Sequence, residues 1–140
     1  MLFRSEEMVV KEALTEEMKS LGASLTRKLD EAGWPIVAAF WYYESDFNRW
    51  KLMLASPRVT SEGSRDLYMA IIHALDALHQ SRTNSNVRVV APDHHVVRAL
   101  ASAFQTGWTI TAIPFSRQAI DRSIIDDAYI YRVTSESAAA

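Results

Sequence analysis

The sequence predicts a single α/β domain, in which a mixed sheet of about five strands is flanked by about three helices. An apolar run over residues 36–43 is followed by a polar turn and a second β-rich run over residues 50–55. Segments with helical periodicity alternate with short β-rich segments in the rest of the chain. With 49% hydrophobic and 23% charged residues, the 140-residue chain has the composition of one globular domain. We assign the domain to residues 1–133 and expect a flexible tail over residues 134–140; an α+β arrangement is the alternative fold class.

The first helix is predicted over residues 5–31. Its apolar residues recur at spacings of three and four, namely Leu14, Met18, Leu21, Leu25 and Leu29. Thr15 could instead be an internal N-cap that restarts the helix. Gly22 weakens the middle of this helix by about 1 kcal/mol relative to alanine. Gly33 and Pro35 predict its end.

A central strand is predicted over residues 36–43, because this run is apolar on both faces. Alternation would place Ile36 with Ala38 on one face and Val37 with Ala39 on the other. The partner strand over residues 50–55 alternates and ends at Ser56-Pro57.

The second helix is predicted to begin with Thr60 or Ser61 as its cap and to run to Gln80. Its buried stripe should consist of apolar residues at helical spacing: Leu67, Ile71, Ala74, Leu75 and Leu78. A strand over residues 87–91 follows, and the order strand, helix, strand predicts a right-handed parallel crossover.

The third helix is predicted to start at Pro92-Asp93, with Asp93 as its cap, and to end around Phe104. Two further strands are expected over residues 108–115 and 123–133. Asp121-Arg122 should form the tight turn that leads into the last strand.

Composition narrows the function classes. The chain has no cysteine, so disulfides, thiolate metal sites and thiol catalysis are excluded, and we expect a cytoplasmic protein. The net charge is −2 and the signs are interspersed, so nucleic-acid binding is not expected, although Arg49-Trp50-Lys51 places an aromatic residue between two cations. No membrane span and no cofactor are expected. No metal site is expected either, because none of the four histidines has ligand spacing on a helix face.

Three groups of residues are candidates for a site. Asp93, His94 and His95 lie where a strand passes into a helix, a place that favours anions and neutral imidazoles; the alternative is a cap with two solvated histidines. Asp121, Asp126 and Asp127 could bind a cation, but neighbouring strand residues face opposite ways, so a solvated strand entry is preferred.

Tyr129 and Tyr131 share a face with Val133. They could form a dimer interface if their strand lies at the sheet edge, or could cover the apolar side under a helix.

The segments Trp50-Lys-Leu-Met-Leu-Ala-Ser-Pro57 and Ile125-Asp-Asp-Ala-Tyr-Ile-Tyr-Arg-Val133 resemble strand patterns of a family of small bacterial proteins of unknown function. The resemblance implies a bacterial cytoplasmic origin and carries no catalytic residue. Our leading functional expectation is a non-catalytic interaction module or accessory subunit, whose partner is a second copy or another protein. The alternative is an enzyme that binds a small molecule or an anion at Asp93, His94 and His95.

Overall fold

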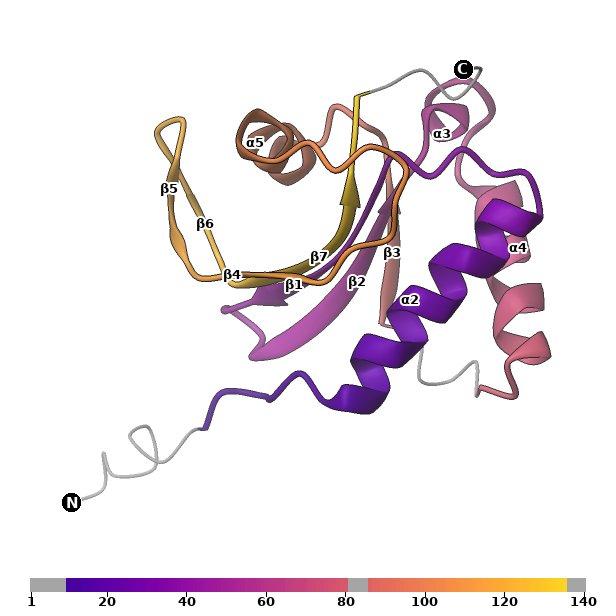
Figure 1. Ribbon diagram of the computed structural model, residues 1–140, viewed down its shortest axis with the longest axis horizontal. Coiled ribbons are helices and arrows are strands. Elements are labelled where there is room, and N and C mark those ends of the chain that lie inside the picture. The colour runs from indigo at the N-terminus through magenta and orange to yellow at the C-terminus, as the bar shows by residue number, and fades with distance from the viewer. Residues whose placement is uncertain (1–9, 81–85, 136–140) are drawn as a thin grey trace.

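The computed structural model describes residues 10–80 and 86–135 (Figure 1). Its five-stranded mixed sheet has the order β3-β2-β1-β7-β4, and β5 and β6 form a separate hairpin. The strands are β1 (Ala38–Glu44), β2 (Arg49–Ala55), β3 (Val87–Val90), β4 (Ile113–Phe115), β5 (Gln118–Ile120), β6 (Ser123–Ile125) and β7 (Ala128–Val133). The helices within these ranges are α2 (Glu16–Glu31), α3 (Pro57–Glu62), α4 (Arg65–Ala77) and α5 (His95–Ala103). The predicted α/β class and five-stranded mixed sheet are confirmed, with one helix more than expected.

Helix α2 begins at the internal cap rather than at the predicted start. The Thr15 hydroxyl accepts a hydrogen bond from the Met18 N–H at 3.1 Å, and residues 10–14 are not helical. The prediction of a continuous helix from residue 5 is therefore wrong over residues 10–15, and residues 5–9 lie outside the described ranges. The helix ends as expected, because Gly33 adopts the left-handed conformation with φ 85°.

Strand β1 is central, as predicted, and pairs antiparallel with both β2 and β7. Ala38 and Phe40 face one apolar cluster, whereas Ala39 and Trp41 face the other. The expected faces of Ile36 and Val37 are reversed. These two residues precede the strand, so strand alternation does not apply to them.

A bulge in β7 changes which side chains share a face of the sheet. Ala39 lies opposite Arg132 and Phe40 lies opposite Ile130, so Tyr131 is an extra residue in the ladder. Tyr131 and Arg132 therefore both point toward α2, while Val133 packs in the opposite cluster. The expectation that Val133 shares a face with Tyr131 is wrong for this reason.

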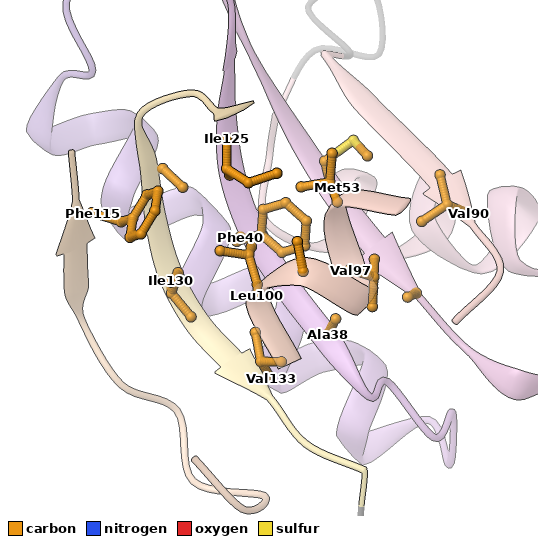
Figure 2. Packing of buried hydrophobic residues seen from close by; sticks show 14 of the residues in the cluster. Ala38, Phe40, Met53, Val90, Val97, Leu100, Phe115, Ile125, Ile130 and Val133 are labelled. Atoms are coloured by element: carbon orange, nitrogen blue, oxygen red, sulfur yellow. The ribbon is translucent and has the colours of Figure 1, made fainter. Parts of the chain in front are cut away.

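Two apolar clusters cover the two faces of the sheet. On one side, α2 and α4 pack over Trp41, Leu52 and Leu54. On the other side, α5 and the β5–β6 hairpin cover a second cluster (Figures 1 and 2). In the second cluster Phe40 lies at the centre of the view in Figure 2, with Leu100 of α5 beside it.

The predicted second helix is two helices. The Ser56 hydroxyl caps α3 by accepting from the Arg58 N–H at 3.3 Å, Pro57 is the first helical residue, and Gly63 ends the helix with φ 84°. Thr60 and Ser61 thus lie inside α3, and the cap predicted there is wrong. In α4 the predicted stripe is buried, except that Leu78, which follows the helix, is half-buried.

The second half of the chain follows the predicted order with shorter strands. Strand β3 runs parallel to β2, as expected for a crossover. Of the strand predicted over residues 108–115, only Ile113–Phe115 is a strand, and the strand predicted over 123–133 divides into β6 and β7. Asp121 and Arg122 form the predicted turn, with φ 51° and 71°. Thr134 is buried and its N–H bonds the Val37 carbonyl, so the predicted tail begins later than expected; residues 136–140 lie outside the described ranges.

Arg132 connects four parts of the fold. Its side chain is 2% exposed, and the guanidinium forms two hydrogen bonds with the Asp30 carboxylate, at 2.9 and 2.8 Å. It also donates to the carbonyls of Ile36 and Trp108, at 3.1 and 2.6 Å. The buried charge therefore ties the end of α2, the approach to β1 and the segment before β4 to strand β7.

Candidate functional site

The two histidines predicted as a site lie together at the start of α5. The His94 Nδ1 accepts a hydrogen bond from the Val96 N–H at 3.2 Å, so His94 caps the helix. The assignment of Asp93 as the cap is wrong, and Asp93 lies exposed just before it. The rings of His94 and His95 stack with centroids 4.6 Å apart.

The electrostatics of this pair favour neutral His94. Burial lowers the pKa of His94 below its ordinary value, and the electrostatic interactions of His94 with His95 and Arg88 lower this pKa further. A neutral ring is also what the cap requires, because Nδ1 accepts a hydrogen bond. One ring nitrogen is thus committed to the helix, and a role of Asp93, His94 and His95 in binding an anion or in catalysis remains a prediction.

The three aspartates do not converge on one point. Asp121 lies exposed in the β5–β6 turn. The Asp126 carboxylate accepts from the Ser45 hydroxyl at 3.2 Å and lies 3.5 Å from the Arg117 guanidinium. The Asp127 carboxylate accepts from the Arg117 N–H at 2.7 Å and pairs with the Lys11 ammonium. Within residues 10–80 and 86–135, no group of three or more histidine and acidic side chains could hold a metal ion.

Strand β7 does not lie at the sheet edge, because it pairs with β1 on one side and β4 on the other. The condition for a dimer through this strand is therefore not met. Tyr131 is 2% exposed, donates to the Lys19 carbonyl at 2.6 Å and accepts from the Trp41 indole at 3.0 Å. Tyr129 is half-buried, with the Lys19 ammonium 5.0 Å from its ring centroid. Both rings lie under α2, which was the alternative interpretation.

A site that the sequence did not indicate lies at the tip of the β1–β2 hairpin. We define the hairpin-tip site as Tyr43, Asn48, Trp50 and Asp127. Asn48 closes the turn in the left-handed conformation, with φ 49°, and its side-chain oxygen accepts from the Tyr43 hydroxyl at 2.6 Å. The rings of Tyr43 and Trp50 lie 5.3 Å apart, so two aromatic faces, an amide and a carboxylate come together.

The N-terminal segment, defined as residues 10–12, occupies this site. Asn48 donates to the Val10 carbonyl at 2.9 Å and accepts from the Glu12 N–H at 2.8 Å. The Lys11 ammonium lies 4.5 Å from the Tyr43 ring centroid and 5.5 Å from that of Trp50, and it pairs with Asp127. The segment thus binds through both main chain and side chains, and it belongs to no helix or strand.

Glu12 satisfies a donor on the edge of the sheet. Strand β3 pairs with β2 only from Leu52 onward, so Trp50 lies beyond the part of β2 that β3 covers. The Trp50 N–H donates to the Glu12 carboxylate, and the Trp50 indole N–H donates to the Glu12 carbonyl, both at 2.8 Å. An edge donor without a partner in a neighbouring strand is what an added length of chain recognises in a sheet.

Sequence reasoning missed this site because its parts are far apart in the chain. Lys11 and Asp127 are separated by 116 positions, and neither belongs to a recognised motif. The usable signal was local: the Thr15 cap excludes residues 10–14 from the helix and leaves Lys11-Glu12 available for a contact elsewhere.

Two hollows lie on the side of α2 and α4. The larger, of about 680 Å³, lies between the first turns of α2 and the residues that follow α4, and Glu16 and Glu17 contribute to its lining. The smaller, of about 340 Å³, lies between α2 and α4 and is lined mainly by Leu29 and alanines, with Lys28 and His73. None of the predicted site residues lines either hollow.

No protein family, curated protein or solved structure significantly matches this chain. Over residues 10–80 and 86–135, every helix is too short or too polar to cross a bilayer.

Proposed function

We propose that the protein is a non-catalytic interaction module that binds an extended segment of polypeptide at the hairpin-tip site. One observation carries this proposal: residues 10–12 of the chain itself lie in the site as a peptide ligand would. The contacts combine a sheet-edge donor, a side-chain amide and an ammonium over aromatic rings. These are recognised elements of peptide recognition.

The bound segment is held weakly enough to be replaced. Its four hydrogen bonds and one ion pair contribute about 1 kcal/mol each, or less for the exposed pair. Ordering the backbone of residues 10–12 costs about 1–2 kcal/mol per residue. The two sums nearly cancel, so the occupied and vacant sites should exchange readily.

The site selects a ligand by charge as well as by shape. Asp127 and the faces of Tyr43 and Trp50 favour an ammonium, while the two N–H groups of Trp50 favour a carboxylate and a carbonyl. The preferred ligand is therefore an extended peptide in which lysine is followed by glutamate, as in Lys11-Glu12.

Titration of the full chain with a fluorescent peptide of residues 7–14 tests the proposal. We expect saturable binding that the Asp127→Lys substitution weakens at least about tenfold, a loss of about 1.4 kcal/mol. Lys11→Ala should strengthen binding of the added peptide, because it loosens the competing segment of the same chain.

The matched control is Asp121→Lys, which makes the same charge change in the exposed β5–β6 turn and should leave binding unchanged. Equal binding to the wild type and to Asp127→Lys, or no binding to Lys11→Ala, would refute the proposed function.

A further inference from the structure

We propose that the partner at the hairpin-tip site is a second copy of this chain, with each copy placing its N-terminal segment in the site of the other. The inference rests on the proposed function and names its ligand. Every copy carries both the segment and the site, so a reciprocal exchange closes a two-fold symmetric dimer.

Charge complementarity supports this occupant. Lys11 meets Asp127 and two aromatic rings, and Glu12 meets the two N–H groups of Trp50. An exchange retains each of these contacts and introduces no unpaired group at the site. The difference in free energy between the closed monomer and the exchanged dimer then depends on the cost of association and on the conformation of residues 13 and 14, which connect the segment to α2. The fraction of dimer therefore depends on the protein concentration.

The connector between the N-terminal segment and α2 permits this exchange. Ala13 and Leu14 belong to no helix or strand, and Ala13 is exposed. The Thr15 cap fixes the first residue of α2 independently of the segment, since its hydroxyl bonds the Met18 N–H. Rotation at residues 13 and 14 can therefore redirect residues 10–12 without disturbing the helix, at the cost of the partial packing of Leu14.

A charge-exchange experiment tests the inference. The variant Lys11→Asp brings two aspartates together at the site, and the variant Asp127→Lys brings two lysines together. This repulsion is present in the closed monomer and in the exchanged dimer, so each variant alone should be monomeric. In an equimolar mixture, the aspartate introduced in one chain can meet the lysine introduced in the other, while the native Lys11 meets the native Asp127 at the second site. Only a mixed dimer satisfies both pairs. The chain carrying both substitutions restores the pair within one copy and is the control for folding.

Sedimentation over a concentration series provides the measurement. We expect the wild type to dimerise, and we expect the mixture to dimerise at least about tenfold more strongly than either variant alone. The wild-type series does not depend on whether the variants fold.

A wild type that stays monomeric at millimolar concentration would overturn the inference, and so would variants that dimerise as well alone as in the mixture. If the added peptide binds while no dimer forms, the proposed function stands and only the second copy is excluded. If neither occurs, both proposals fail.

Discussion

Gly22→Ala is expected to destabilise the protein, although glycine inside a helix usually costs about 0.5–1 kcal/mol relative to alanine. The reason is the close approach of α2 to β7. A Cβ added at Gly22 would lie 2.3 Å from the Tyr131 hydroxyl oxygen and 2.5 Å from the nearest ring carbon. Both distances are shorter than any normal contact, so the ring must move.

Two hydrogen bonds resist that movement. The Tyr131 hydroxyl donates to the Lys19 carbonyl at 2.6 Å and accepts from the Trp41 indole at 3.0 Å. Moving the ring weakens these bonds at about 1 kcal/mol each, and overpacking a full core costs about 1–3 kcal/mol. After subtracting the gain of about 1 kcal/mol in helix propensity, the net loss should be about 2–4 kcal/mol.

Urea unfolding of the wild type and the variant measures this loss as a lower midpoint at unchanged slope. The control is the same substitution in a Tyr131→Leu chain, where the hydroxyl and outer ring atoms are gone. There Gly22→Ala should be neutral or stabilising by up to about 1 kcal/mol, which gives a clear coupling in the double-mutant cycle. A Gly22→Ala protein more stable than the wild type would refute the reasoning.

Three further predictions concern the fold. Asp30→Ala should lower the free energy of unfolding by about 3 kcal/mol, because it leaves the buried Arg132 charge unpaired, and adding Arg132→Met should recover part of the loss in urea unfolding. Because the pKa of His94 is lowered in the folded protein, the stabilisation that its neutral ring provides is fully present above pH 6.5 and is lost as the pH falls toward the folded pKa. A His94→Asn chain should therefore show a smaller fall in the urea midpoint between pH 8 and pH 5 than the wild type does. Asp121→Asn with Arg122→Gly should raise stability by about 0.5–1 kcal/mol in thermal unfolding, since both residues have positive φ.

Each of these has a contrary outcome. If adding Arg132→Met to the Asp30→Ala chain lowers its stability further, the unpaired Arg132 charge is not the cause of the loss of stability. If the urea midpoints of His94→Asn and of the wild type fall equally between pH 8 and pH 5, the histidine cap does not contribute to the loss of stability at low pH. A lower melting temperature for the Asn-Gly turn would mean that Asp121 or Arg122 makes a stabilising contact.

The sheet was predictable where local pattern and burial agree. The apolar run of β1 could only lie inside a sheet, and the polar turn after it set the pairing with β2. The Asp121-Arg122 turn and the parallel β3 also followed from local signals. The start of α3 had a usable signal in Ser56-Pro57, which is both a cap and a first-turn proline.

Other features depend on contacts between distant residues. The bulge at Tyr131 arises from pairing with β1, and nothing in the sequence of β7 marks an extra residue. The position of β7 inside the sheet likewise depends on strand order, which alternation does not specify. The candidate sites show the same distinction: the adjacent histidines were visible in the sequence, whereas the hairpin-tip site required the three-dimensional arrangement of Asn48, Trp50 and Asp127.

Strand β7 lies between β1 and β4 in the sheet, although it follows all the other described strands in the chain. A nascent chain that has not yet reached β7 can form the β1–β2 hairpin, but one side of β1 then has no ladder partner. The native sheet therefore cannot close until residues 128–133 have left the ribosomal exit tunnel, whichever helices have formed before then.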